Sequence, residues 1–479
     1  MDVNLLPLLP ATQVLLTALV VTLLDLFLKE NEKGLLAWIS LLGLVLCGVE
    51  TVLLWGSQDG AFGDTLLLDN FTLFFTQIFL GAAGLTILAS IHYVRETRIY
   101  EGEFYALILF ATAGMIVMAA ANDLIVFFLG LETMSVAVYI LTGMWRASSR
   151  SSEAAMKYFL IGAFATGFLL YGIALIYGAT GSTNLNEISA NLVEPMTEWP
   201  LYLAGGVLLL LIGFAFKVGA VPFHFWIPDV YEGAPTPVTG FMSVAVKAAA
   251  FAAWVRILMH KLSPFDSDWD APLWLMAIAT MTLGNLLALS QPSVKRMLAY
   301  SSIAHAGYLL IALVVGEEWG GPPLLFYLVT YAFMTIGAFA VLASLTDQDG
   351  PRENYSDFAG LGFKRPFLAA AMSLFMLSLA GFPPLAGFTG KFYIFRSAIL
   401  AGHTNLAIIA VLNSLLSVIY YLRVIVAMYM EEGGVEGKSF RQSPYLYIAV
   451  ALALFGTVYL GIIPARGLEW SRVSFFALD

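Results

Sequence analysis

The sequence consists of long apolar stretches that are separated by short polar turns. A helix needs about 20 mostly apolar residues to cross a lipid bilayer, and fourteen stretches meet this requirement. The predicted spans cover residues 5–28, 34–55, 69–92, 104–121, 123–145, 157–180, 201–231, 236–261, 271–291, 295–315, 322–346, 366–399, 404–430 and 443–463. The pattern predicts an all-α polytopic membrane protein with about fourteen transmembrane helices.

Two of these spans contain signals that interrupt a helix. In span seven, Pro222 follows Lys217 by little more than one helical turn, and in span twelve Pro383 and Pro384 lie next to each other. Proline removes a backbone donor and clashes with the preceding turn. Irregular backbone at membrane depth is tolerated where it is buried in protein or lines a water-filled cavity. We therefore expect helices seven and twelve to be broken.

The basic residues outside the spans alternate from one loop to the next. The odd-numbered loops contain fourteen Lys and Arg residues, and the even-numbered loops with the C-terminal tail contain four. The odd-loop residues are Lys29, Lys33, Arg95, Arg98, Arg146, Arg150, Lys157, Lys295, Arg296, Arg352, Lys364, Arg365, Lys438 and Arg441. By the positive-inside rule the odd loops are cytoplasmic. Both termini are then predicted on the opposite side of the membrane.

A few charged residues remain inside the predicted spans. The five basic ones are Lys217, Lys247, Arg256, Lys391 and Arg423, and the most deeply placed acidic one is Glu132. A charge at the bilayer centre costs roughly 2.5–3.5 kcal/mol or more, so such residues usually mark ion paths. Arg256 lies near the end of its span, and we expect its side chain to reach the membrane surface by snorkelling.

Glu132 and Lys217 have properties that suit a protonation switch. Burial disfavours the charged form of a lysine, whereas a nearby carboxylate favours it. A change in the Glu132–Lys217 interaction would therefore load or unload a proton. A packing role for Glu132, and a backbone-bonded structural role for Lys247, are the alternatives. His224, Asp229, His305 and Arg423 are further candidates for proton transfer, and each can equally be structural.

The two broken spans suggest an internal repeat. They lie five spans apart, and the segment Tyr139–Leu141 of span five aligns with Tyr308–Leu310 of span ten. Because five is odd, successive copies have opposite orientations, which is a recurrent design of transporters. We predict N-terminal helices over 1–103, a first repeat over 104–261, a second over 271–430 and a C-terminal helix within 431–479.

Composition excludes several other classes of protein. Hydrophobic residues make up 60% of the chain, charged residues 12%, and the mean hydropathy is +0.84, whereas soluble proteins have about 25% charged residues. The net charge of −10 includes no basic tract for nucleic acid. Cys47 is the only cysteine, so cysteine-based metal motifs are absent. The apolar N-terminus lacks a basic segment before it, so we interpret it as a retained first helix.

Four motifs resemble one known family. "FFLGLETMSVAVYIL", "GFAFKVGAVPFHFWIPDVYEGAPTPV", "VKRMLAYSSIAHAGY" and "LSLAGFPPLAGFTGKFY" are similar to the antiporter-like membrane subunits of respiratory complex I, and most similar to those of the N type. The resemblance implies fourteen helices, with inverted five-helix repeats at spans 4–8 and 9–13. It also implies that Glu132, Lys217, Lys247 and Lys391 are the buried ionisable residues of the family.

The resemblance further implies a proton-translocating subunit of NADH-quinone oxidoreductase in a bacterial inner membrane, with both termini periplasmic. NADH, FMN, iron–sulfur clusters and quinone are then expected in partner subunits, with no cofactor or metal in this chain. The expected neighbours are lipid, an antiporter-like subunit of the M type, and small membrane subunits of the K and J types. Three alternatives stay open: a subunit of a multi-subunit sodium/proton antiporter, a stand-alone solute transporter, and a scaffold subunit.

Overall fold

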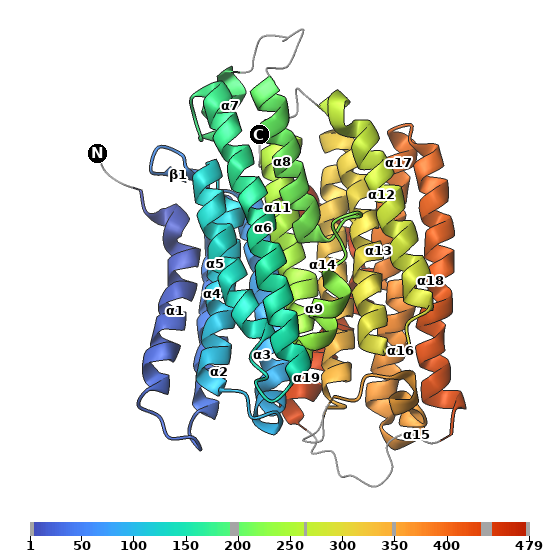
Figure 1. The fold of residues 1–479 in the computed structure, drawn as a ribbon. Helices are drawn as coiled ribbons and strands as arrows, with labels where there is room; N and C mark the ends of the chain where they lie inside the picture. The colour runs from blue at the N-terminus through green and yellow to red at the C-terminus, as the bar shows by residue number, and fades with distance from the viewer. Residues whose placement is uncertain (1–3, 192–200, 263–265, 347–350, 433–442, 476–479) are drawn as a thin grey trace.

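The protein forms a bundle of long helices that run roughly side by side (Figure 1). A computed structural model describes residues 4–191, 201–262, 266–346, 351–432 and 443–475. Within these ranges the only strands are β1 (Asp59–Ala61) and β2 (Leu66–Leu68), which pair as an antiparallel hairpin. The hairpin lies at the end of the bundle where the chain begins. The predicted all-α membrane fold is confirmed.

Most of the predicted spans are single unbroken helices. These are α1 (Leu9–Asp25), α2 (Gly34–Leu53), α3 (Asn70–Glu96), α4 (Glu101–Ala120), α5 (Leu124–Thr142), α6 (Ser149–Thr180), α12 (Asp266–Leu289), α13 (Val294–Val314), α14 (Gly316–Ala343), α18 (Thr404–Met430) and α19 (Pro444–Ile462). The shorter helices outside the spans are η1 (Leu6–Leu8), α7 (Leu185–Asn191), η5 (Tyr355–Phe358), α15 (Leu361–Lys364) and α20 (Pro464–Phe475).

Spans seven and twelve are broken, as the prolines predicted. Span seven consists of α8 (Leu201–Val218) and α9 (Ile227–Gly233), and span twelve of α16 (Pro366–Ala380) and α17 (Ala386–Leu400). Gly219 and Gly381 follow the first halves with φ values of 75° and 93°, a left-handed conformation that commonly ends a helix. In the described residues, 13 helices are long and apolar enough to cross a membrane. The paired half-helices α16 and α17 complete the fourteen predicted spans.

Span eight is the most deeply buried helix of the bundle. It runs from Thr236 to Lys261, and residues 236–259 are all buried. It contains α10 (Thr236–Phe241), a π-helical segment η2 (Met242–Val246), α11 (Lys247–Trp254) and a second π-helical segment η3 (Val255–Lys261). Insertions of π-helix are frequent at functional sites, and here the first one ends directly at Lys247.

Backbone hydrogen bonds repeat between the two halves of the chain. At the start of span five, Leu124 N donates to Thr183 O and Leu185 N donates to Asn122 O, both at 2.9 Å. At the start of span ten, Val294 N donates to Glu353 O at 2.7 Å and Tyr355 N to Pro292 O at 3.4 Å. The same pairing, of a helix start with the loop after the next span, therefore occurs twice, five spans apart, in agreement with the fold predicted for two inverted repeats.

Glycine allows the first two helices of each repeat to pack closely. A Cβ atom on Gly114 of α4 would lie 2.6 Å from the backbone nitrogen of Met134 on α5. A Cβ atom on Gly284 of α12 would likewise lie 2.6 Å from the backbone nitrogen of Ala304 on α13. Since real Cβ atoms do not approach so closely, both positions require glycine, and both repeats begin with the same type of helix pair.

The loop boundaries differ at several predicted basic residues. Lys157 lies inside α6, and Lys295 and Arg296 lie in the first turn of α13. α6 begins earlier than hydropathy indicates, because Ser148 caps its first turn by accepting from Ser151 N. α13 begins within one residue of its predicted start, and Ser293 caps it by accepting from Arg296 N. Lys438 and Arg441 lie outside the described residues.

Candidate functional site

Three lysines of the predicted path are buried without a carboxylate partner. Lys217 and Lys247 are 2% exposed and Lys391 is 3% exposed. In the part of the chain that the structure describes, no carboxylate oxygen lies within 4.0 Å of their ammonium nitrogens. Hydroxyl groups and backbone carbonyls surround them instead. Such sites are costly for a permanent charge and suit a group that gains and loses a proton.

Lys217 is held by span five. It lies in the last turn of α8, and its Nζ donates to Ser135 Oγ of α5 at 2.8 Å. The same nitrogen lies 5.8 Å from the ring centre of Tyr139. The negative end of the α8 dipole favours a positive charge at this position.

Glu132 lies one turn before Ser135 on α5 but does not form an ion pair with Lys217. Its side chain is half-buried, and its Oε1 atom is buried without a hydrogen-bond partner. The pair predicted from the sequence is therefore separated in this conformation by more than the 4.0 Å of an ion pair. Ser135 lies between the two residues in the chain and is the group that Lys217 contacts.

Lys247 faces the second repeat. Its Nζ donates to the backbone oxygen of Ser302 and, at 3.0 Å, to Ser302 Oγ. Ser302 lies on α13, so this contact joins span eight to span ten. The backbone-bonded arrangement weighed as a structural alternative is present, together with a hydroxyl group that can pass on a proton.

His305 forms the centre of a hydrogen-bonded cluster one turn further along α13. It is 1% exposed, and its Nδ1 and Nε2 atoms contact the hydroxyls of Tyr327 and Tyr421. The Tyr421 hydroxyl also contacts Ser301 Oγ, and Ser301 is adjacent to Ser302. Lys247 thus contacts Ser302, and the adjacent Ser301 is linked through Tyr421 to His305.

Lys391 lies at the second break. Its Nζ donates to Leu379 O at 2.9 Å, to Ala380 O at 3.2 Å and to Ser414 Oγ at 2.9 Å. Leu379 and Ala380 end α16, so Lys391 satisfies carbonyls that the break leaves without intrahelical donors. The nitrogen also lies 4.9 Å from the ring centre of Tyr308.

Tyr308 connects the Lys391 region with His305. Its ring meets the His305 ring edge-on at 5.6 Å, and its hydroxyl accepts from Asn285 Nδ2 at 3.1 Å. Asn285 Oδ1 in turn accepts from the Tyr420 hydroxyl at 2.8 Å. The structure therefore gathers Lys247, His305 and Lys391 around one buried polar region, while Lys217 and Glu132 lie on its other side with span five.

Two of the remaining candidates lie away from this region. His224 lies in the segment between α8 and α9, with Nδ1 buried and unpartnered. Arg423 is exposed, and its guanidinium carbon lies 4.1 Å from the ring centre of Tyr355. Burial raises the pKa of the Tyr355 phenol to about 12, so the ring stays neutral and holds Arg423 by a cation–π contact.

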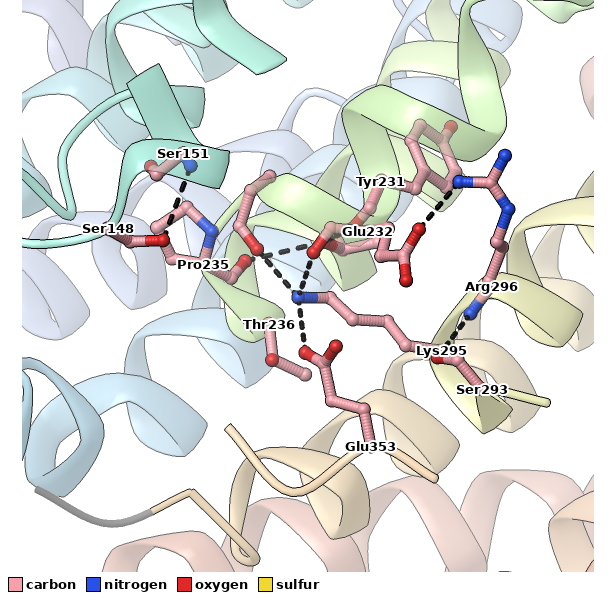
Figure 2. Close-up of polar contacts among 12 residues, drawn as sticks. Ser148, Ser151, Tyr231, Glu232, Pro235, Thr236, Ser293, Lys295, Arg296 and Glu353 are labelled. Atoms are coloured by element: carbon pink, nitrogen blue, oxygen red, sulfur yellow. Dashed lines mark hydrogen bonds and ion pairs between the residues drawn. The ribbon is translucent and has the colours of Figure 1, made fainter. Parts of the chain in front are cut away.

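Asp229 belongs to a cluster of ion pairs at the end of α9. Its carboxylate lies 2.9 Å from Lys157 Nζ and 2.9 Å from Arg296 Nη1. Arg296 also pairs with Glu232 at 2.6 Å. The cluster joins α6, α9 and α13, and Figure 2 shows its Arg296–Glu232 pair. Asp229 therefore links both repeats and forms no ion pair with the three buried lysines.

Lys295 is a fourth buried lysine that hydropathy placed in a loop. It is 2% exposed, and its Nζ donates to Glu232 O, Ala234 O and Glu353 Oε1 at 3.0, 2.7 and 2.8 Å (Figure 2). The Glu353 side chain is itself 8% exposed. With a carboxylate and two carbonyls as acceptors, the Lys295 ammonium anchors the end of α9.

Replacing Lys295 by methionine is expected to destabilise the protein by about 3–5 kcal/mol, because it leaves the Glu353 carboxylate buried without a partner. The measurement is the thermal unfolding midpoint in detergent, together with the amount of chain in the membrane. Lys29→Met is the matched control, since Lys29 is exposed. Equal midpoints for the two variants would contradict the anchoring role.

Arg256 does not snorkel, which corrects the prediction. It is 1% exposed, and its guanidinium forms a two-point ion pair with Asp69 at 2.8 and 2.9 Å. It also donates to Thr72 Oγ1 and Ala119 O, both at 2.9 Å. Because Asp69 supplies the counter-charge at the start of α3, the arginine is stable inside the bundle.

The partners of the lysines and of His305 were not identified from the sequence. Ser135 and Ser414 contact lysines, Tyr327 and Tyr421 contact His305, and all four are polar residues of a kind found in many membrane spans. The one available signal was the position of Ser135, which follows Glu132 by three residues and so lies on the same helix face. Among the described residues, no group of three or more His, Cys, Asp and Glu side chains could hold a metal ion.

Comparisons with known proteins agree with this architecture. The model of the family described as NADH:quinone oxidoreductase/Mrp antiporter, TM, matches residues 121–417. The NADH-quinone oxidoreductase subunit N of Trichlorobacter lovleyi is 48% identical over 470 residues, which cover 98% of this chain and 96% of that protein.

Solved structures give the same fold. A chain of respiratory complex I from Thermus thermophilus with bound aureothin is 37% identical, with a TM-score of 0.82 over 96% of this chain and 98% of that one. A chain of the Mrp complex from Dietzia sp. DQ12-45-1b has a TM-score of 0.81 at 23% identity, over 99% of this chain and 97% of that one, and shows the shared fold alone. The chain belongs to the NADH-quinone oxidoreductase subunit N family of antiporter-like membrane subunits.

Proposed function

We propose that the chain is the proton-translocating membrane subunit of an NADH-quinone oxidoreductase and carries protons along its buried lysines. The observation that carries the proposal is the placement of Lys217, Lys247 and Lys391 in sites with hydroxyl and carbonyl partners but no carboxylate. The 48% identity to a protein named NADH-quinone oxidoreductase subunit N supports the assignment to this complex.

The proton enters from the cytoplasm at the first break and leaves to the periplasm at the second. The arrangement of the half-helices supports opposite access, because α8 lies in the upper and α9 in the lower part of Figure 1, whereas α16 lies in the lower and α17 in the upper part. The excess of basic residues in the odd loops supports a bacterial inner membrane topology with both termini periplasmic.

Lys217 is the loading site. In the present conformation its ammonium donates to Ser135, and Glu132 is more distant. Movement of Glu132 toward Lys217 favours the charged lysine, and movement away favours its release of the proton. Ser135 holds the ammonium in the separated state.

The proton then passes from Lys247 into the second repeat. Proton transfer requires donor and acceptor within hydrogen-bond reach, directly or through one water. Ser302 meets this requirement next to Lys247, and the hydroxyls of Ser301 and Tyr421 continue to His305. Lys391 is the terminal site, adjacent to the second break.

The energy for this cycle comes from partner subunits. NADH, FMN, iron–sulfur clusters and quinone bind there, and the coupling reaches this chain electrostatically through its membrane neighbours. We propose an antiporter-like subunit of the M type and small subunits of the K and J types as those neighbours. This chain supplies the proton path and no redox chemistry.

The test of this function is to purify the complex that contains the chain and reconstitute it into liposomes without sodium. We expect the complex to contain the subunits of an NADH-quinone oxidoreductase and to take up protons when NADH is oxidised. A strict requirement for sodium, together with the absence of NADH-oxidising subunits, would favour the alternative of a multi-subunit sodium/proton antiporter, whose known representative shares the fold.

Replacing Ser135 by alanine is expected to lower proton translocation through this chain about tenfold, because a lost hydrogen bond to a charged group is worth roughly 1.5–3 kcal/mol. Ser135→Thr keeps the hydroxyl and should retain most of the activity. The measurement is NADH-driven proton uptake by proteoliposomes at equal amounts of complex. Full activity of Ser135→Ala would show that Lys217 does not depend on this contact.

A further inference from the structure

The part of span eight between Lys247 and its outer end contains no polar side chain for two turns. The residues from Ala248 to Val255 are all apolar and at most 1% exposed. The outer end here means the end of the bundle where the chain begins and the β1–β2 hairpin lies (Figure 1). Span eight itself therefore offers no titratable or hydroxyl side chain toward this end over these eight residues, about 12 Å at 1.5 Å of rise per residue.

Aromatic rings from three helices fill this apolar section. Trp254 stacks on Phe214 of α8 with ring centres 5.5 Å apart, and it also stacks on Phe251 at 6.3 Å. Phe214 in turn contacts Phe127 of α5 at 5.4 Å. All four side chains are at most 1% exposed. We call Phe127, Phe214, Phe251 and Trp254 the aromatic layer.

The aromatic layer lies on the outer side of both inner lysines. Phe214 precedes Lys217 by one turn on α8, and the chain of α8 enters the bundle from the outer end. Trp254 follows Lys247 by two turns toward the outer end of span eight. A single layer thus separates Lys217 and Lys247 from that end.

The first polar groups beyond the layer, Arg256 and Asp69, already hydrogen-bond to other protein groups. Arg256 directs its guanidinium to Asp69, Thr72 and Ala119 O. Asp69 additionally accepts from Thr72 N at 2.7 Å. Both oxygens of the Asp69 carboxylate are thus already engaged, so the pair offers no free acceptor to a proton that crosses the layer.

We propose that the aromatic layer, backed by the Arg256–Asp69 pair, seals the outer end of the first repeat. The proton on Lys247 then has one way forward, through Ser302 to the second repeat. Hydrophobic constrictions block conduction by excluding water, and a proton needs water or a hydroxyl at each step. The seal prevents protons from leaking through the first repeat directly to the outer end. This role rests on the proposed proton path.

The test is the passive proton permeability of liposomes that contain the intact complex, without NADH or quinone. A pH gradient is imposed, potassium and valinomycin clamp the potential, and an internal dye reports the decay. Trp254→Ser and Phe214→Ser each introduce a hydroxyl into the layer, and each is expected to accelerate the decay several-fold. Phe79→Ser is the matched control, because Phe79 of α3 is equally buried and lies outside the layer.

The outcomes separate the seal from the proposed path. The seal is overturned if liposomes with assembled Trp254→Ser and Phe214→Ser complexes have the same proton permeability as those with wild type. It is also overturned if Phe79→Ser raises the permeability equally. If Trp254→Ser fails to assemble, the proton leak of Phe214→Ser alone tests the seal. Adding Lys247→Met to a leaking variant should stop the leak. A leak that persists would support the seal but would show that Lys247 does not supply the protons that leak.

Discussion

Replacing Lys247 by methionine is expected to lower proton flux through this chain about 100-fold, since positioned acid–base groups contribute roughly 10²–10⁴ to such transfers. Methionine fills a similar volume but cannot hold a proton. Lys247 contacts the second repeat from the middle of span eight, through Ser302. The measurement is the number of protons taken up per NADH oxidised by the reconstituted complex.

Lys247→Arg distinguishes a proton carrier from a fixed charge. Arginine keeps the positive charge but is not deprotonated in proteins, so we expect this variant to be as inactive as Lys247→Met. Lys29→Met, at an exposed position, should leave the proton yield unchanged. Normal proton yield in Lys247→Arg with normal assembly would mean that Lys247 serves only as a charge.

The number of helices and the two breaks were predictable because they depend on local chemistry. Hydropathy reports the transfer of each segment into lipid, and Pro222, Pro383 and Pro384 each remove a backbone donor within a span. The inverted repeat followed from the odd spacing of the breaks. The helix start at Ser149 was missed, since the Ser148 cap extends α6 into polar sequence that hydropathy assigns to a loop.

The roles of individual charges were less predictable because they depend on partners that are distant in the sequence. Lys295 was assigned to a loop, and Arg256 was expected to reach the surface. Their carboxylate partners lie 58 and 187 residues away, so no local pattern reveals them. By contrast, Lys217, Lys247 and Lys391 were correctly expected to be buried, because apolar residues flank them on both sides.

The buried basic residues therefore fall into two groups. Lys295 and Arg256 are each paired with a buried carboxylate, and such pairs hold their charges permanently. Lys217, Lys247 and Lys391 contact only neutral acceptors, so their charge costs more and can change. Both kinds are equally buried, and the presence of a counter-charge is what separates the structural positions from the candidates for proton transfer.

Replacing Arg256 by methionine is expected to destabilise the chain by about 3–5 kcal/mol, because it leaves the Asp69 carboxylate buried without its counter-charge. Asp69 is 6% exposed and joins α3 to span eight through this pair. The measurement is the unfolding midpoint of the complex in detergent, with the amount of assembled subunit in the membrane as a second readout.

Combining Arg256→Met with Asp69→Asn should recover most of the lost stability. Asparagine removes the unpaired charge and remains a good N-cap, so the bond that Thr72 N donates to residue 69 at the start of α3 is preserved. The stability of Arg256→Lys should lie between those of wild type and Arg256→Met, since a lysine provides the charge but not the two-point contact of a guanidinium. If the double variant were as unstable as the two single variants added together, the two residues would act independently and the ion pair would not be what holds α3 against span eight.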